Sequence, residues 1–309
     1  MFKSRGRNFW LVLSLAVFVT FFSVWSPHFA DLENMLGILD QSSINIVVAV
    51  GMTLVVASAG IDLSVGAGVA MVGVLMAALL KEGLAPSAAI GAGLLAGGLI
   101  GVLNAFLIVK VRVTPFMATL TMMNLVAGAT LILTQGIPIY GFSPEFAWIG
   151  RGKPGGVPVS VWIAGGVFLA GFCIVRFTRL GLYALALGSN EEALRRVGVP
   201  TGLYKGALYA LSGVGAAAAS VVLTAKLNSA EPLAGAMVEM NAIATVILGG
   251  TGIRGGRANM VGTLLAGLIL GVLRNGLVLV GVSSYYQQFA TGIIILVAIV
   301  VSEVRRRGE

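Results

Sequence analysis

The sequence predicts an all-α protein that crosses a membrane about ten times. Only 10% of its 309 residues are charged, 58% are hydrophobic and the mean hydropathy is +0.99, whereas about a quarter of the residues in an average soluble domain are charged. Many of its charge-free stretches reach the roughly 20 residues that a helix needs to cross the hydrocarbon core. The ten candidate spans are 8–30, 41–61, 63–80, 83–109, 113–144, 154–175, 206–225, 240–253, 258–273 and 275–302.

The distribution of basic residues predicts that both chain ends lie in the cytoplasm. With the N-terminus inside and ten crossings, 15 of the 20 Lys and Arg residues fall in internal segments, four fall outside, and Arg274 lies near the outer end of a span. This asymmetry follows the positive-inside rule. In a soluble protein the net charge of +8 would suggest a nucleic-acid partner. Here it reflects orientation in the lipid bilayer, and no nucleic-acid partner is expected.

The first span follows Lys3, Arg5 and Arg7 and has two interpretations. Basic residues before an apolar run are typical of a secretory signal peptide, but such a peptide also needs a small-x-small cleavage pattern. Trp25 and Pro27 occupy the place where that pattern would lie, and nine more apolar runs follow. We therefore interpret the first run as a membrane anchor.

The second and third spans are expected to be joined by a short internal turn. After an external loop over 27–40, the second run leads into the third with almost no linker, which places the turn at Gly60. Asp62 and Ser64 are of the types that cap helix N-termini, and we interpret Asp62 as a capping residue. An acid deep in a span would indicate ion or proton binding, but Asp62 lies at the end of a span.

The fourth span carries small residues at helical spacing. Gly93, Gly97 and Gly101 repeat every four residues, which lets two helix backbones approach closely in lipid. We interpret this pattern as helix packing rather than as part of a pore. Pro115 is placed to begin the fifth helix.

The segment 136–158 is the longest external segment and is a candidate docking surface. It contains Tyr140 and Trp148, which also fit the commoner role of anchors at the membrane–water interface. The sequence does not decide between the two roles.

The run 240–253 is too short to cross a bilayer alone. It must extend across Glu239 or form a bent or half-inserted element, which requires a backbone buried in protein. The run ends in GTGIRG, and the spacing of its glycines matches that of dinucleotide-binding motifs. Because such a motif requires a soluble βαβ unit, we interpret GTGIRG as a tight turn. The sequence has no GxxxxGK[ST] phosphate-binding loop, so energy from nucleotides must come from another chain and no cofactor is expected.

An internal repeat is visible in two apolar runs. Residues 94–109, LLAGGLIGVLNAFLIV, align without gaps with residues 264–279, LLAGLILGVLRNGLVL. Five crossings separate the copies, so they would run in opposite directions, as in the inverted repeats of transporters. We expect a single transmembrane domain over 1–309, with repeat halves of approximately 41–135 and 204–304 and a cytoplasmic segment 178–203 between them.

The segment Gly181–Pro200 is predicted to contain a short cytoplasmic helix with sharp ends. Ser189 and Glu192 form a capping-box pattern, which should open the helix at Asn190. Gly198 can take the left-handed position at its end. Glu191 with Arg195 and Glu192 with Arg196 are acid-before-base pairs, and Ala193, Leu194 and Val197 form a small apolar face. Because eight residues cannot stabilise a helix alone in water, this face needs a surface to pack against.

Four stretches resemble one family when they are taken together. SAGIDLSVGAGVAM, VTPFMATLTMM, LGLYALALGSNEEALRRVGV and AIATVILGGTGIRGG occur in this order and resemble the membrane permease of ribose-, xylose- and arabinose-type ABC sugar importers, over about 44–301. The resemblance implies a ten-helix permease in the bacterial inner (plasma) membrane. It also implies a homo- or heterodimer of permeases, two cytoplasmic ABC ATPase subunits and an extracytoplasmic sugar-binding protein.

The same resemblance implies that the cytoplasmic segment couples the permease to the ATPase. The coupling residues are then Ser189, Asn190, Glu191, Glu192, Ala193, Leu194, Arg195, Val197 and Gly198. Two departures from the family pattern are mild: Ser58-Ala59-Gly60 replaces a usual double glycine, and Gly252-Ile253-Arg254 is more basic than is common.

The translocation path is expected to use uncharged hydrogen-bonding residues within the spans. The candidates are Asn45, Asn104, Thr121, Asn124, Asn241, Thr245 and Gln287.

The sequence leaves open two other kinds of transport protein, namely a branched-chain amino-acid or nucleoside ABC permease and an ion-coupled secondary transporter. The last would need acids deep in spans, whereas Asp62 and Glu239 lie at ends. An enzyme is not expected, because no paired carboxylates, metal-ligand cluster or activated nucleophile appear. The sequence does not name the sugar.

Overall fold

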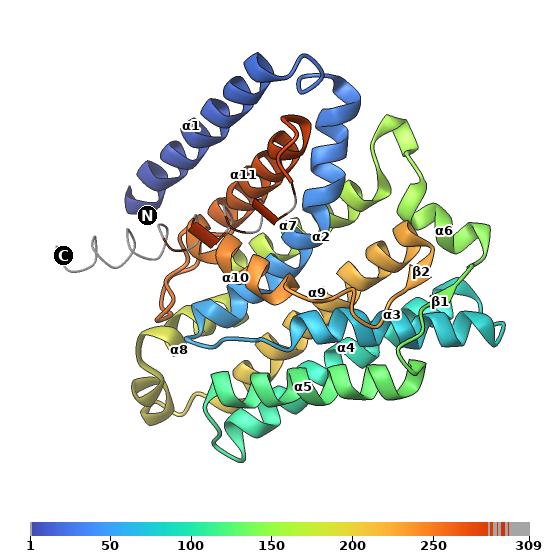
Figure 1. The fold of residues 1–309 in the computed structure, drawn as a ribbon. Helices are drawn as coiled ribbons and strands as arrows, with labels where there is room; N and C mark the ends of the chain where they lie inside the picture. Colours follow the sequence, from blue (N-terminus) through green and yellow to red (C-terminus); the bar gives the residue numbers. More distant parts are fainter. Residues whose placement is uncertain (1, 284, 287–288, 290–291, 294–295, 297–309) are drawn as a thin grey trace.

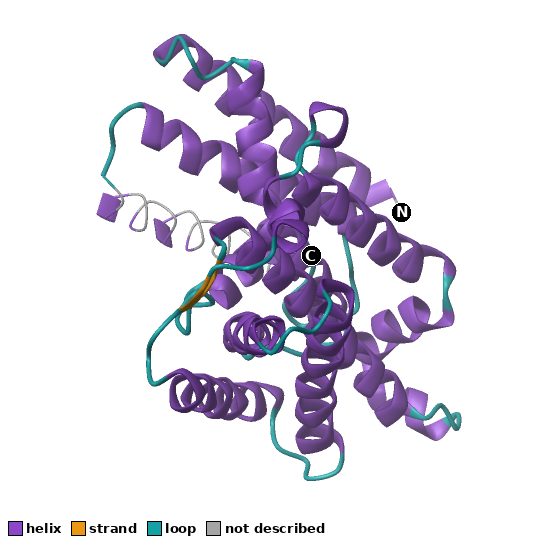
Figure 2. Cartoon of the chain, turned by 90° about the vertical axis from the view of Figure 1, so that its right-hand side faces the viewer, coloured by secondary structure: helices purple, strands orange, loops and turns teal. Residues whose placement is uncertain are grey.

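The computed structural model describes residues 2–283 and, beyond them, residues 285, 286, 289, 292, 293 and 296 (Figure 1). Its α-helices are α1 (Phe2–Trp25), α2 (Leu32–Ala57), α3 (Val65–Lys81), α4 (Pro86–Val109), α5 (Pro115–Thr134), α6 (Pro144–Arg151), α7 (Val159–Phe177), α8 (Arg179–Arg196), α9 (Thr201–Leu227), α10 (Val238–Gly249) and α11 (Met260–Leu279). The strands β1 (Ile139–Tyr140) and β2 (Ser229–Ala230) form a short antiparallel ladder. Figure 2 shows that helices make up nearly all of the described structure.

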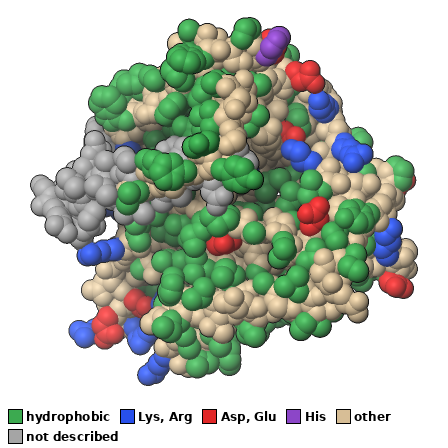
Figure 3. Space-filling view, viewed as in Figure 1, with side chains coloured by type: hydrophobic (Ala, Val, Ile, Leu, Met, Phe, Trp, Pro, Cys, Tyr) green, Lys and Arg blue, Asp and Glu red, His purple; other side chains and the backbone are tan. Residues whose placement is uncertain are grey.

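Nine of the ten predicted spans coincide with helices. Among the described residues, seven helices are long and apolar enough to cross a membrane, and α3 and α10 are shorter apolar helices. Arg274 lies near the end of α11, as expected, but the helix continues past the run's boundary at 273 to Leu279. The rest of the run 275–302 falls largely outside the described residues. Figure 3 shows charged side chains gathered toward opposite sides of the molecule, with a broad hydrophobic band between them.

The segment 27–40 is mostly helical, not the loop that its charges suggested. α2 begins at Leu32, and its first turn contains Glu33. A carboxylate is favourable there because it faces the positive end of the helix dipole. Asp40 lies inside α2, where it pairs with Lys226 of α9.

Two long helices form the centre of the fold. α9 packs against α4, α2 and α3, and α2 packs against α9, α11, α7 and α10. The expected glycine packing in α4 is confirmed: a Cβ at Gly97 or Gly101 would overlap the backbone of α9 at Gly213 or Tyr209. Gly97 and Gly101 therefore allow the backbone of α4 to pack directly against the backbone of α9.

The molecule has two ends that carry different elements. We call the region around α8, with the end of α2 and the turn 250–259, the α8 end. The region around α6, with the β1–β2 ladder and the α3–α4 turn, we call the α6 end. α3 and α10 begin near the middle of the molecule and run toward opposite ends (Figure 1). The half-inserted alternative for the run 240–253 thus matches α10, which has 12 residues.

Candidate functional site

The predicted coupling helix lies at the α8 end, with its start shifted by one residue. α8 runs from Arg179 but kinks at Asn190. Asn190 Oδ1 accepts a hydrogen bond from the Ala193 backbone N–H at 2.9 Å, so Asn190 is the cap. The predicted capping role of Ser189 is wrong. Because the chain is already helical before the kink, the Ser189 hydroxyl donates back to the Leu185 carbonyl at 3.0 Å.

The two predicted ion pairs are present, and a third was missed. Glu191 and Glu192 each lie 3.3 Å from the arginine four residues later. In addition, Lys205 Nζ, at the start of α9, lies 2.6 Å from Glu191 Oε2. The Lys205 side chain is only 18% exposed, so this pair is better shielded from solvent than the other two. Sequence spacing could not reveal it, since the contact crosses the α8–α9 connection.

The small apolar face of the coupling helix is divided between the core and the surface. Leu194 packs against the main hydrophobic cluster, whereas Val197 is 74% exposed and Ala193 is also exposed. Gly198 has φ +81°, which confirms the left-handed end of the helix. Ala193 and Val197 therefore remain free to contact a partner.

The first part of α8 is in close backbone contact with two other segments. A Cβ at Gly188 would overlap the Ala57 carbonyl, at the end of α2, and the backbone of Gly255 and Gly256. The Gly256 N–H donates to the Ala57 carbonyl at 2.8 Å. A movement of α8 would therefore act directly on the end of α2 and on the turn that follows α10.

That turn is also held by the first helix. The Arg7 guanidinium donates to the carbonyls of Ile247 and Gly250 at 3.3 Å each, at the C-terminal end of α10. Cations are favourable at this end because the last carbonyls of a helix carry partial negative charge. Asn259 donates to Asn8 Oδ1 at 2.7 Å and to the Gly249 carbonyl at 2.9 Å. The turn thus links α1, α8, α10 and α11.

The turn between α2 and α3 contains a buried carboxylate with four hydrogen-bond contacts. Asp62 Oδ1 accepts from the Ser64 backbone N–H at 3.1 Å, from the Ser64 hydroxyl at 2.7 Å and from Asn104 Nδ2 at 3.4 Å. Asp62 Oδ2 accepts from the Ser212 hydroxyl at 2.9 Å. The neighbouring Ile61 carbonyl accepts from Thr119 and Tyr209 at 3.3 Å each.

The predicted capping role of Asp62 is wrong, because Ser64 is the N-cap residue of α3 and no side chain caps this helix. The Asp62 side chain joins the turn to α4 and α9, and the Ile61 carbonyl adds α5. Asp62 lies at a helix end, as the sequence indicated, but that end is inside the molecule and 1% exposed. Asn104, a candidate path residue, is fully buried in this cluster. Ser212 was missed because it lies 150 residues away in the sequence.

α3 and α10 meet at their N-terminal ends. A Cβ at Gly66 would overlap the Glu239 carboxylate, and a Cβ at Gly235 would overlap the Gly66 carbonyl. Glu239 lies in the first turn of α10 and is 9% exposed. Glu239 thus lies at the start of its helix, as the sequence indicated, and its side chain is buried there against α3.

The remaining path candidates separate into two groups. Asn45 Nδ2 donates to Thr245 Oγ1 at 2.7 Å, and Thr245 Oγ1 donates to the Asn241 carbonyl at 2.7 Å, so these three residues lie together between α2 and α10. Thr121 and Asn124 are exposed on α5 instead, and Asn124 donates to the Leu120 carbonyl of its own helix. Gln287 lies outside the described residues.

The α6 end carries a three-helix polar contact. Lys226 Nζ of α9 lies 2.6 Å from Asp40 Oδ2 of α2, and the Ser160 hydroxyl of α7 donates to Asp40 Oδ1. The sequence did not indicate this contact, because its members come from three separate runs. It ties the α6 ends of α2, α7 and α9 together.

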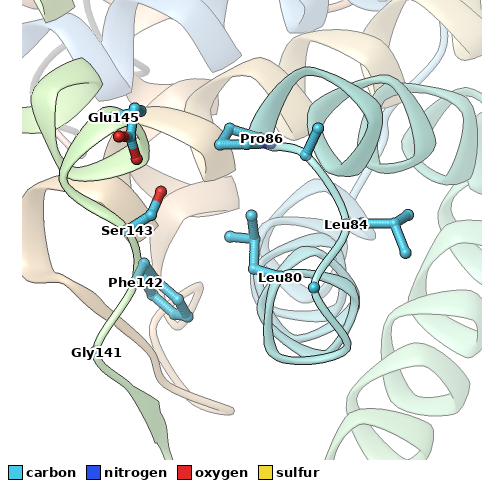
Figure 4. Close-up of a pocket in the computed structure, with 9 residues that line it drawn as sticks. Leu80, Leu84, Pro86, Gly141, Phe142, Ser143 and Glu145 are labelled. Atoms are coloured by element: carbon cyan, nitrogen blue, oxygen red, sulfur yellow. The ribbon is translucent and has the colours of Figure 1, made fainter.

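A groove also opens at the α6 end, between the α3–α4 turn and the segment that enters α6 (Figure 4). Leu80, Leu84 and Pro86 form one wall, and Phe142 and Glu145 lie on the other. The backbone N–H of Glu145 and the Ser143 hydroxyl lower the pKa of the Glu145 carboxyl, so it is negatively charged near neutral pH.

Within the described residues, no three His, Cys, Asp or Glu side chains are grouped so that they could hold a metal ion.

Comparison with known proteins gives consistent matches. The family described as branched-chain amino acid transport system / permease component matches residues 34–299. The ribose import permease protein of Escherichia coli K12 is 44% identical over 294 residues, covering 94% of this chain and 92% of the relative. The ribose import permease protein of Bacillus subtilis 168 is 40% identical, covering 93% and 90%. The D-allose transport system permease protein of Escherichia coli K12 is 36% identical, covering 92% and 88%. No solved structure matches the chain.

Proposed function

The chain belongs to the family of branched-chain amino acid transport system permease components, and from this premise we propose that it is the permease subunit of an ABC sugar importer. It passes a monosaccharide through the bacterial inner membrane into the cytoplasm, and it is not itself an enzyme. The observation that carries the proposal is the 44% identity to a ribose import permease over nearly the whole length of both chains.

The α8 end faces the cytoplasm in this proposal. Basic side chains of α1, α8 and the turn after α10 lie there, including Arg7, Arg195, Arg196 and Arg254, as the positive-inside rule requires. With ten crossings both termini are cytoplasmic. The α6 end, with its groove and its ladder, then faces the external sugar-binding protein.

Two repeat halves of opposite orientation are supported by the packing of six helices. α4 packs on α3 and α9, and α11 packs on α10 and α2. The aligned segments 94–109 and 264–279 lie in α4 and α11. If the halves are approximately 41–135 and 204–304, then α2, α3 and α4 correspond to α9, α10 and α11. The contacts of α4 with α3 and α9 then have counterparts in those of α11 with α10 and α2. The segment 178–203 lies between the halves, and all belong to one domain over 1–309.

The coupling segment receives force from the ATPase subunits. Residues 189–198 present Ala193, Val197 and charged side chains to the partner, as a short helix in a groove of another protein would. The segment is anchored by Lys205 and by the contact of Gly188 with Ala57 and Gly256. ATP-driven movement of the segment is thereby passed to the ends of α2 and α10, both of which lead to the centre of the molecule.

The sugar passes along α10 and between this chain and a second permease subunit. Asn45, Asn241 and Thr245 provide uncharged hydrogen-bonding groups beside α10. Thr121 and Asn124 are exposed on α5, and polar side chains favour contact with protein or water over lipid. A second permease subunit, identical or related, would cover that face.

The test uses the assembled importer. We expect the purified chain to associate with its ATPase subunits and, in liposomes with the external sugar-binding protein, to take up ribose or a related monosaccharide only when ATP is supplied. Glu191→Ala combined with Arg195→Ala should lower both ATPase association and uptake. Uptake driven by a proton or sodium gradient without ATP would contradict the proposal, as would uptake of a branched-chain amino acid in place of a sugar.

A further inference from the structure

We propose that Glu239 is the residue that accepts the hydroxyl groups of the sugar at the middle of the translocation path. This inference rests on the proposed function and assigns a role to a carboxylate at the point where α3 and α10 meet.

The position of Glu239 follows from the length of its helix. α10 has 12 residues, which at 1.5 Å per residue is about 18 Å. It ends at Gly249, at the α8 end, so Glu239 lies about 15 Å from that end. The hydrocarbon core is about 30 Å thick. Glu239 therefore lies close to the middle of the membrane.

The Glu239 carboxylate lies against backbone rather than against a cationic side chain. It covers Gly66 in the first turn of α3, beside the Gly235 carbonyl, and the donors it meets are the backbone N–H groups of Met237 and of Glu239 itself. In the described residues, no Lys or Arg forms an ion pair with it. The N-terminal ends of two short helices, α3 and α10, therefore face this carboxyl group.

The surroundings of Glu239 are open on one side. Met237 and Met240 are 48% and 43% exposed, and Leu233, in the turn before α10, is 68% exposed. The Glu239 side chain itself is 9% exposed. A solute that reached this point would meet apolar groups that fit its C–H surface and, behind them, a carboxyl group that can accept hydrogen bonds.

A second acceptor without a partner lies beside the same helix. The Asn45 Oδ1 atom is buried and has no hydrogen bond, although its Nδ2 binds Thr245 of α10. Buried acceptors without a donor are costly, so this atom favours a ligand that brings donors. Glu239 of α10 and Asn45 of α2 therefore provide acceptors at two levels along α10.

This chemistry selects neutral solutes rich in hydroxyl groups. Hydroxyl groups can donate hydrogen bonds to the oxygens of a carboxyl group. A solute carboxylate would find no cationic partner here among the described residues, and an unpaired buried charge is costly where the dielectric constant is low. The arrangement thus favours a monosaccharide over an amino acid or a sugar acid.

The experiment compares three variants in the complete importer with its ATPase subunits and sugar-binding protein in liposomes. Radiolabelled ribose uptake and ATP hydrolysis are measured together, and their ratio is the readout. Glu239→Gln should lower the sugar-per-ATP ratio about tenfold, equivalent to about 1.4 kcal/mol, while ATP hydrolysis stimulated by the binding protein is retained. Glu239→Asp, which keeps the charge, should recover part of the ratio. Glu231→Gln, which changes an exposed acid before α10, should match the wild type.

Two outcomes would overturn the inference. One is a wild-type ratio in Glu239→Gln. The other is a proportional loss of uptake and ATP hydrolysis with lowered thermal stability and no recovery in Glu239→Asp, which would indicate a purely structural role. A wild-type complex that moves no sugar would overturn the proposed function, and the inference with it. Normal wild-type transport with a normal ratio in Glu239→Gln would overturn the inference alone.

Discussion

Lys205 Nζ lies 2.6 Å from Glu191 Oε2, which joins the first turn of α9 to the coupling segment. The same helix contacts the Asp62 carboxylate through Ser212 and the Asp40 carboxylate through Lys226. Three polar side chains of α9 thus contact the α8 end, the centre and the α6 end of the molecule. A change in the position of the coupling segment would reach all three levels through one helix.

The Lys205–Glu191 pair should contribute more than the pairs within α8. Because Lys205 is mostly shielded from solvent, a double-mutant cycle with Lys205→Gln and Glu191→Gln should give a coupling energy of about 1 kcal/mol, measured by thermal unfolding of the purified chain. The exposed pair of Glu192 with Arg196 is the matched control and should give about 0.5 kcal/mol or less. Equal coupling energies for the two pairs would contradict this ranking.

Gly188 should tolerate no side chain. Gly188→Ala places a methyl group onto the Ala57 carbonyl and the Gly256 backbone, and backbone atoms cannot yield as a side chain can. We expect the free energy of unfolding to fall by about 3 kcal/mol, together with weaker ATPase association. Gly206→Ala in α9, where a Cβ meets nothing within 4 Å, should be neutral or stabilise by up to about 1 kcal/mol. Similar unfolding midpoints for both variants would show that the contact at Gly188 is loose.

The sequence predicted local features well because they depend on neighbouring residues. The apolar runs gave nine helices, and the spacing of Glu191, Glu192, Arg195 and Arg196 gave both ion pairs within α8. The left-handed end at Gly198 also followed from local rules. The capping residue was misplaced by one position, since Ser189 and Asn190 both fit an N-cap and only the course of the preceding turn decides between them.

Features that depend on distant contacts could not be predicted from the sequence. Asp62 was interpreted as a capping residue, yet its partners Asn104 and Ser212 lie 42 and 150 residues away. Glu239 was placed at the end of a run, and its burial against Gly66 of α3 could not be read from the sequence. The short length of the run 240–253 was the one available signal that its start lies in the interior. The role of the seven candidate path residues stays a prediction.

The Ser212 hydroxyl should matter more than a similar hydroxyl eight residues later. Ser212→Ala removes a donor from the buried Asp62 Oδ2, which is then left without a partner, and this should cost about 2 kcal/mol. Ser220 donates to the Val69 carbonyl at 2.6 Å, but Val69 lies inside α3, where carbonyls also bond along the helix. Ser220→Ala should therefore cost about 1 kcal/mol or less. Both serines are fully buried in α9, so the stabilities of the two variants can be compared directly by thermal unfolding. A loss of stability in Ser220→Ala that equals or exceeds the loss in Ser212→Ala would contradict the importance of the Asp62 cluster.

The Asp40–Lys226 pair should hold the α6 ends of α2 and α9 together. Each side chain is partly buried, so Lys226→Met leaves Asp40 without its counter-ion and Asp40→Asn does the same to Lys226. We expect each single substitution to destabilise the chain more than the double substitution does, with a coupling energy of about 1 to 3 kcal/mol by thermal unfolding.

In the proposed importer the pair also bears on transport, because a path that opens at the α6 end must separate helices there. If α2 and α9 move apart there, the pair breaks, and its removal shifts the population toward the open state. Lys226→Met should then raise ATP hydrolysis by the importer in the absence of the sugar-binding protein. Ser160→Ala, which removes a hydrogen bond from the same carboxylate but leaves the ion pair, should raise it less. An unchanged basal rate in Lys226→Met, with the coupling energy present, would mean that α2 and α9 stay joined at this end throughout the transport cycle.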